Sequence, residues 1–210
     1  MLGALGLAEQ KSHAWWDACA GQGGKALALL ERGVQVALCS DTSRGRLSRI
    51  SPQCSVLALP RPHIVQANAM APPLARWNGH ILLDVPCSGL GVLSSRPDLR
   101  RRISAGHLDG CAALQACILR QAAGCLLPGR RLAYITCTLN PAENQRQVAC
   151  FLAEHADFSL AVEWQTPLEH PWMEGMYGAL LARERKSVLT AQRQGDSTGQ
   201  AAPHCFHTSG

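Results

Sequence analysis

One short stretch of this chain constrains its fold and its chemistry more than any other. Residues 81–91 read ILLDVPCSGLG, so an apolar run leads into Asp84, Pro86, Cys87 and a glycine-containing turn. An apolar run that is bounded by turn residues predicts a buried parallel strand. Because ligands of open α/β sheets bind at the carboxyl ends of such strands, we expect Asp84 and Cys87 to lie at a functional site.

Apolar runs of this kind alternate with helical patterns along most of the chain. The expected strands are residues 13–18, 34–39, 63–66, 81–85, 131–137, 158–163 and 176–181. Helical patterns cover residues 26–32, 43–50, 107–127 and 141–155, and Pro52 is expected to stop the second of them. The alternation predicts an α/β fold with a doubly wound, mostly parallel, seven-stranded sheet and a late antiparallel strand at its edge.

The composition is that of one globular domain. The chain has 210 residues, of which 47% are hydrophobic and 17% are charged, enough to bury a single core. We expect the domain to cover residues 1–186 and the polar residues 187–210 to form a disordered tail. No apolar run approaches the length of a membrane span, and the amino terminus lacks the basic region of a signal peptide. We therefore expect a cytoplasmic protein without a membrane partner.

Cysteine spacing and charge narrow the functional classes. The ten cysteines are spread through apolar segments without a C-x-x-C pair, which argues against a metal site and for buried thiols in a reducing compartment. The formal net charge is +5, and the densest basic cluster is Arg96, Arg100, Arg101 and Arg102. This charge is compatible with a nucleic-acid partner, although a solvated helix face is the simpler explanation of the cluster.

A glycine-rich loop follows the first expected strand. Residues 17–25 read DACAGQGGK, and residues 21–26 fit the dinucleotide-binding pattern G-x-G-x-x-A between a strand and a helix. Asp41, at the end of the second strand, is placed to hold a ribose or to cap the following helix. These features alone leave a nicotinamide-dependent oxidoreductase open as an alternative.

A second cysteine at a strand end favours a different chemistry. Cys137 ends the strand expected over residues 131–137, and if its neighbour is the strand before Cys87, both thiols and Asp84 meet at one edge of the sheet. A dehydrogenase needs no such trio, whereas a cytosine methyltransferase does. A thiolate adds to C6 so that C5 can accept a methyl group, and an acid stabilises the adduct at the N3 edge. The attacking cysteine needs local activation, because a free thiol is mostly protonated at neutral pH.

Several motifs resemble those of the Sun/nucleolar-protein (Sun/NOL/NOP) family of RNA 5-methylcytosine methyltransferases. They are DACAGQGGK at residues 17–25, DVPCSGLGVLSSRPDLR at residues 84–100, LAYITCTLNPAENQRQV at residues 132–148 and GMYGALLAR at residues 175–183. The resemblance covers residues 14–183 in the family's order. It implies a Rossmann-like methyltransferase catalytic domain that uses S-adenosylmethionine and acts on RNA, with ribosomal RNA as the first expectation.

The resemblance also implies roles for individual residues. Cys137 would be the nucleophile on C6, Cys87 would assist product release, and Asp84 would hold the cytosine and border the methyl donor. The cofactor-binding residues would be Asp17, Cys19, Ala20, Gly21, Gln22, Gly23, Gly24, Lys25, Asp41, Asn68 and Asp84. Within this set the glycines and Lys25 would cradle the methionine part, and Asp41 would hold the ribose.

The chain departs from the family pattern in three respects. Gln22 replaces a proline in the loop, and Asn68 stands where the family has an aspartate. Few residues precede Asp17, so we expect RNA recognition to come from a missing upstream domain or a partner subunit. These departures leave open a second hypothesis, in which a degenerate methyltransferase fold binds cofactor or RNA without catalysis.

Overall fold

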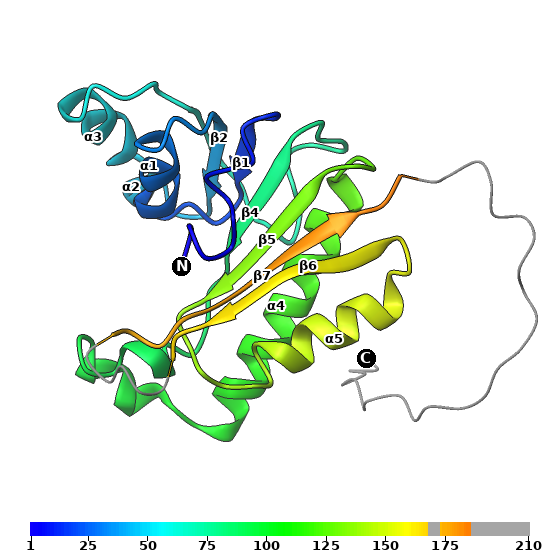
Figure 1. Cartoon of the computed structure of the whole chain (residues 1–210). Coiled ribbons are helices and arrows are strands. Elements are labelled where there is room, and N and C mark those ends of the chain that lie inside the picture. The colour runs from blue at the N-terminus through cyan, green and yellow to red at the C-terminus, as the bar shows by residue number, and fades with distance from the viewer. Residues whose placement is uncertain (168–172, 186–210) are drawn as a thin grey trace, which may run out of the picture.

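A seven-stranded sheet organises the chain, and helices cover its two faces (Figure 1). The computed structural model describes residues 1–167 and 173–185, so the tail predicted for residues 187–210 lies outside the described residues. The strands are β1 Trp15–Asp17, β2 Val36–Asp41, β3 His63–Gln66, β4 His80–Asp84, β5 Arg131–Thr136, β6 Phe158–Gln165 and β7 Tyr177–Arg183. Their order across the sheet is β3-β2-β1-β4-β5-β7-β6.

The strand directions confirm the predicted fold class. The pairs from β3 to β5 are parallel, and β7 runs antiparallel between β5 and β6. The fold is therefore α/β, as the sequence predicts. Its sheet is mostly parallel and is completed by a late antiparallel strand. Because β4 pairs in parallel with β5, with Asp84 opposite Ile135, the carboxyl ends of these two strands lie side by side.

Alternate residues of the central strands enter two hydrophobic cores. Ile81 and Leu83 of β4 face one core and Leu82 faces the other, as expected for strands that are buried on both sides. The helices are α1 Gly24–Leu30, α2 Arg44–Leu47, α3 Ile50–Val56, α4 Ala105–Cys125 and α5 Gln145–Glu154, with the 3-10 helices η1 Leu90–Val92 and η2 Pro97–Arg102. α4 and α5 pack in the first core, and α1, α2 and α3 pack in the second (Figure 1). Within the described residues, no helix combines the length and apolarity needed to cross a membrane.

The first residues of the chain complete the second core. Leu5 and Leu7 are fully buried in the core that Leu82 enters. Leu5 packs so closely on β7 that a Cβ atom on Gly178 would lie 2.6 Å from its Cδ1. Each buried leucine stabilises the fold by about 1.5–3 kcal/mol, so this segment contributes substantially to that face of the sheet.

The helices α1 and α4 lie within two residues of their expected bounds, and two other helical segments differ more from the prediction. The helix expected over residues 43–50 is divided into α2 and α3, and Pro52 lies in the first turn of α3 instead of stopping a helix. Proline is tolerated there because the first N–H groups of a helix have no intrahelical acceptor. The last helix begins at Gln145 rather than Pro141, and residues 141–144 form a turn that belongs to the site.

Candidate active site

The loops after β4 and β5 bring two cysteine thiols into contact. Cys87 Sγ lies 2.9 Å from Cys137 Sγ, and the backbone N–H of Cys137 donates to Cys87 Sγ over 3.2 Å. Both cysteines are half-buried, so solvent reaches the pair. The structure thus brings together the two thiols that the sequence places at neighbouring strand ends.

The contact between the thiols shifts their pKa values in opposite directions. A thiolate at Cys137 would accept the S–H of Cys87, and this contact lowers the pKa of Cys137 and raises the pKa of Cys87. Burial and the Asp84 carboxylate each raise the pKa of Cys137 in part, whereas Lys25 lowers it further. Cys137 is therefore the thiol that ionises first, and Cys87 stays protonated.

Asp84 and Lys25 form an ion pair beside the thiols. Lys25 comes from the first turn of α1, and its Nζ contacts the Asp84 carboxylate at the end of β4. The Lys25 and Asp84 side chains are 18% and 34% exposed, so water screens the pair only in part. The ion pair connects the glycine-rich loop to the strand end that leads to Cys87.

The glycine-rich loop requires glycine at two of its positions. Gly21 and Gly23 have φ angles of 54° and 89°, in the left-handed region that other residues disfavour. A Cβ atom on Gly23 would also lie 2.8 Å from Ile50 Cγ1, whereas one on Gly24 would have no neighbour within 4 Å. The loop therefore presents bare backbone, which a ligand can approach closely.

Asp17 is buried next to this loop with one unsatisfied oxygen. It is 1% exposed, it accepts a hydrogen bond from the Cys19 backbone, and its Oδ1 has no partner among the described residues. Burial, with Asp84 nearby, raises the pKa of Asp17 to about 7. An unpaired buried acceptor is costly, so this atom fits a donor or a cation of a ligand. Cys19 is half-buried, with a pKa that burial raises, and Ala20 is buried.

Asp41 already accepts hydrogen bonds from three donors. Its Oδ2 accepts the Gly21 N–H at 2.9 Å, while its Oδ1 accepts the Ser43 N–H at 2.8 Å and a guanidinium N–H of Arg46 at 2.7 Å. Ser43 is the N-cap of α2, so the alternative that Asp41 caps this helix is wrong. One accepting position is left on Oδ2, and Arg46, whose side chain is 51% exposed, is the donor that is free to move away.

Asn68 and Gln22 have their side-chain oxygens committed to local contacts. Asn68 is exposed, and its Oδ1 accepts the backbone N–H of Met70 in a turn after β3. Gln22 is also exposed, and its Oε1 accepts a hydrogen bond from Arg49 at 3.4 Å. Neither amide nitrogen donates to another described residue, so both remain available to a ligand.

A buried polar cluster behind the thiols goes beyond the sequence-based prediction. It consists of Ser88, Gln115, Tyr134, Thr138, Glu143 and Asn144, each almost or fully buried. Gln115 lies on the face of α4 that the periodicity assigns to the core, and a polar residue on that apolar face is the one signal of the cluster. Glu143 and Asn144 lie in a segment that the pattern predicts as helix, which conceals their role.

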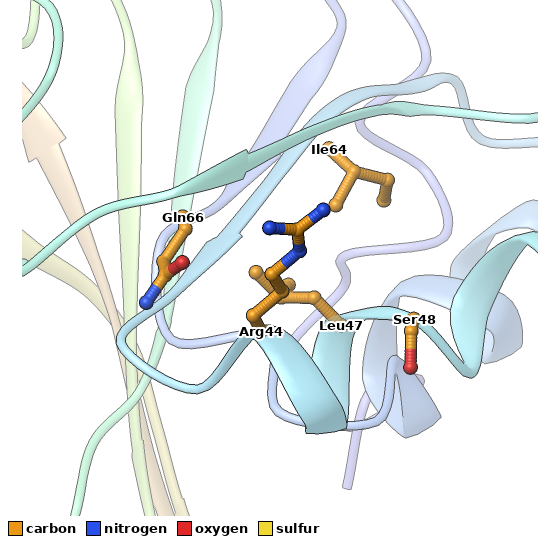
Figure 2. A pocket seen from close by; sticks show the side chains of 5 residues that line it. All are labelled: Arg44, Leu47, Ser48, Ile64 and Gln66. Carbon is orange, nitrogen blue, oxygen red and sulfur yellow. The ribbon is translucent and has the colours of Figure 1, made fainter.

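A separate hollow of about 350 Å³ lies beside α2 and β3 (Figure 2). Its lining residues are Arg44, Leu47, Ser48, Ile64 and Gln66, and the Arg44 side chain extends between Ile64 and Gln66. The hollow adjoins the end of β2, because Gln66 pairs with Asp41. Neither the thiols nor the Lys25–Asp84 pair lines it, so the chemistry described above lies elsewhere on the sheet edge.

Comparison with known proteins identifies relatives that are longer than this chain. A family model described as 16S rRNA methyltransferase RsmB/F matches residues 4–187. Ribosomal RNA small subunit methyltransferase B of Xanthomonas campestris pv. campestris is 39% identical over an alignment of 146 residues that covers 67% of this chain and 33% of that protein. The protein of the same name from Shewanella oneidensis is 35% identical over an alignment of 193 residues that covers 84% of this chain and 44% of that protein. The chain thus spans less than half the length of these relatives.

Solved structures agree with the fold. NSun6 from Pyrococcus horikoshii, determined with SFG, has a TM-score of 0.74 at 23% identity and covers 87% of this chain with 51% of its own. TrmN from Thermus thermophilus has a TM-score of 0.59 at 21% identity and covers 86% of this chain with 47% of its own. At these identities the likeness concerns the fold alone. The match over residues 4–187 goes further, and it shows that the chain belongs to the 16S rRNA methyltransferase RsmB/F family.

Proposed function

We propose that this chain contains the catalytic domain of an S-adenosylmethionine-dependent methyltransferase that modifies C5 of a cytosine in ribosomal RNA. The observation that carries the proposal is the 2.9 Å contact between the Cys87 and Cys137 thiols at the strand ends beside Asp84. One thiol suffices to attack a base, and a second at the same point suits a reaction whose covalent intermediate must also be released. The names of the relatives from Xanthomonas campestris and Shewanella oneidensis agree with an RNA substrate.

The residues at the ends of β1 and β2 fit S-adenosylmethionine. The glycine-rich loop offers bare backbone, the unpartnered Oδ1 of Asp17 offers an acceptor to a cationic group, and Asp41 keeps an acceptor for a ribose hydroxyl. Lys25 and the exposed amides of Gln22 and Asn68 border the same edge of the sheet. When bound, this cofactor supplies an electrophilic methyl group.

Cys137 is the nucleophile in this proposal. Its thiolate adds to C6 of the cytosine, after which C5 is electron-rich enough to accept a methyl group. The pKa of Cys137, lowered first by the hydrogen bond from Cys87, supports this assignment because the thiolate is the reactive form. Asp84, held by Lys25, is assigned to the N3 edge of the base, where its carboxylate would accept from the N4 amino group and from N3 once that nitrogen is protonated in the adduct.

Cys87 takes part in release of the product. After methylation C5 carries both the methyl group and a proton, so this proton must pass to a base as the bond between C6 and Cys137 breaks. Water, which reaches the half-buried thiol pair, is assigned as that base. The electron pair of the C5–H bond restores the double bond between C5 and C6, and Cys137 departs as a thiolate. The protonated Cys87, in contact with Cys137, stabilises that departing thiolate through its S–H.

Incorporation of a labelled methyl group tests the proposed reaction. The full chain, incubated with methyl-labelled S-adenosylmethionine and ribosomal RNA, is expected to yield labelled 5-methylcytidine after digestion of the RNA. Cys137→Ala should abolish the label, whereas Cys117→Ala, at a free and half-buried cysteine of α4, should retain it. Label that persists in Cys137→Ala, or that appears in another nucleoside, would overturn the proposal.

A second candidate is a module that binds cofactor or RNA without catalysis. The Arg46–Asp41 ion pair favours the RNA-binding form of this module, because Arg46 occupies part of the carboxylate assigned to the ribose. Calorimetric titration with S-adenosylhomocysteine, run beside the labelling assay, separates the two: the enzyme binds it and labels RNA, whereas the module yields no labelled product. The nicotinamide-dependent alternative loses its support, because the family match and the thiol pair both favour a methyltransferase.

A further inference from the structure

Glu143 is a buried carboxylate surrounded by hydrogen-bond donors rather than by a cation. Its side chain is 0% exposed and forms no ion pair within the described residues. Oε2 accepts the Ser88 N–H and the Gln115 side-chain amide, each at 2.9 Å. Oε1 accepts the Ser88 hydroxyl at 2.5 Å and the Asn140 side-chain amide at 3.1 Å. Together these donors fill the accepting positions of an ionised carboxylate.

The donors to Glu143 come from both loops that carry the thiols. Ser88 directly follows Cys87, and Asn140 belongs to the turn that follows Cys137. Gln115 adds the middle of α4, and its amide also donates to the Pro86 carbonyl at 2.9 Å. A single carboxylate therefore joins the loop after β4 to the loop after β5.

The neighbouring residue Asn144 makes hydrogen bonds to a different part of the site. Its Oδ1 accepts the Thr136 hydroxyl at 2.6 Å, and its Nδ2 donates to the Thr138 carbonyl at 2.9 Å. These two contacts involve the residues on either side of Cys137, so they fix the backbone of Cys137. Glu143 instead reaches across to Ser88, so it fixes where the Cys87 loop lies relative to Cys137.

The connection between the loops depends on the two accepting oxygens of the Glu143 side chain. A glutamine at this position has one accepting oxygen, and its NH2 group would face other donors. Leaving buried donors unpaired is costly, so the loop after β4 would shift to find new partners. A residue that only filled space would not need a carboxylate here.

We propose that Glu143 is a positioning residue that holds the Cys87 thiol against Cys137. It touches neither thiol and acts through Ser88 and the turn at Asn140. Without it, Cys137 loses its S–H donor and becomes both a weaker nucleophile at neutral pH and a poorer leaving group. The catalytic consequence rests on the proposed function, whereas the positioning of the thiols does not.

The pH dependence of Cys137 alkylation tests this positioning without RNA. The full chain is treated with iodoacetamide across a pH series, and the alkylated Cys137 peptide is quantified by mass spectrometry. In Glu143→Gln we expect the midpoint to rise toward that of an ordinary cysteine thiol, because the contact with Cys87 contributes most to the lowered pKa. Asp84 and Lys25, the charged groups that face Cys137, are unchanged in this variant, so the shift reports on Cys87.

Two further variants keep the test decisive. Ser40 is similarly buried, and its hydroxyl accepts the Trp16 indole N–H at 2.9 Å without a hydrogen bond to either thiol loop, so Ser40→Ala should leave the midpoint at its wild-type value. Ser88→Ala removes one donor but keeps the backbone N–H, so it should raise the midpoint by a smaller amount than Glu143→Gln. If Glu143→Gln does not fold, Ser88→Ala decides. An unchanged midpoint in the folded Glu143 and Ser88 variants overturns the proposal.

Turnover separates failure of the positioning role from failure of the proposed function. If the wild type methylates cytosine, Glu143→Gln should lower kcat about tenfold while leaving the KM for S-adenosylmethionine unchanged. An unchanged kcat together with an unshifted midpoint overturns the role of Glu143. If the wild type methylates no RNA but the midpoint still rises, the positioning stands and the proposed function fails.

Discussion

Cys87 and Cys137 carry the same side chain, but their contact shifts their pKa values in opposite directions. The sulfurs lie 2.9 Å apart, and the pKa of Cys137 is lowered while that of Cys87 is raised, so Cys137 is the thiol that ionises more readily. The sequence predicts that both thiols lie at strand ends, because apolar runs indicate strands and parallel neighbours share an edge. It does not predict which thiol has the lowered pKa, because that depends on how two loops fold around Glu143.

The buried carboxyl of Asp17 is predicted to weaken the fold as the pH rises. Its pKa is raised from 3.8 to about 7, so the folded chain keeps a proton that the unfolded chain releases. Its contribution to stability is full below pH 3.8 and is lost as the pH rises through about 7. Asp17→Asn should abolish this loss, which is on the order of a few kcal/mol. Urea unfolding over a pH series checks it, and parallel stability curves for wild type and variant would contradict it.

The buried imidazole of His80 is predicted to weaken the fold as the pH falls. Burial, followed by the influence of His13, lowers its pKa from 6.5 to about 4, and its neutral Nδ1 accepts the Arg131 N–H at 3.0 Å. The neutral imidazole makes its full contribution to the free energy of unfolding above pH 6.5, and this contribution is lost as the pH falls through about 4. His80→Asn keeps an acceptor without titrating, so it should reduce the acid-induced loss of stability by up to about 3 kcal/mol. Thermal unfolding at neutral and acidic pH measures this, and equal acid sensitivity of wild type and variant would argue against it.

At the scale of elements, the sequence predicts strands better than turns. β3 has its predicted bounds, and β4 and β5 end within one residue of theirs, because turn residues bound each apolar run. Pro52 is misread as a stop because proline in a first helical turn looks the same in sequence as proline beyond a helix. The turn at residues 141–144 is not predictable, because its partners Ser88 and Gln115 are distant in the chain.

Gly91 links the Cys137 loop to the connection between β6 and β7. Its N–H donates to the Cys137 carbonyl at 3.1 Å, and its carbonyl accepts the Gly175 N–H at 2.7 Å. A Cβ atom on Gly91 would lie 1.8 Å from the Gly175 oxygen, so the two backbones must separate in Gly91→Ala. We expect this variant to lose about 1–3 kcal/mol in urea unfolding and to lose methyl transfer as well.

Gly110 provides the matched substitution for Gly91. It is an exposed residue in α4, and a Cβ atom there would meet nothing within 4 Å. Gly110→Ala should therefore stabilise the chain by about 0.5–1 kcal/mol through helix propensity. Equal effects of the two substitutions would show that Gly91 has no special packing constraint.

At the scale of the whole molecule, the site lies where the strand order reverses. The order β3-β2-β1 runs one way from the centre and β4-β5 runs the other, which is the position where open α/β sheets bind ligands. Asp17 and Asp41 end strands on one side, and the loops with the two thiols follow strands on the other. The Lys25–Asp84 ion pair spans the reversal, so it couples the proposed cofactor side to the proposed base side.

Covalent trapping of the chain on RNA tests the central claim most directly. In RNA that contains 5-fluorocytidine, fluorine at C5 cannot leave as a proton does, so the adduct at C6 persists. The account predicts a covalent complex whose modified peptide contains Cys137, no complex with Cys137→Ala, and accumulation of the complex on ordinary RNA with Cys87→Ala. A complex that maps to Cys87, or one that persists in Cys137→Ala, would contradict it.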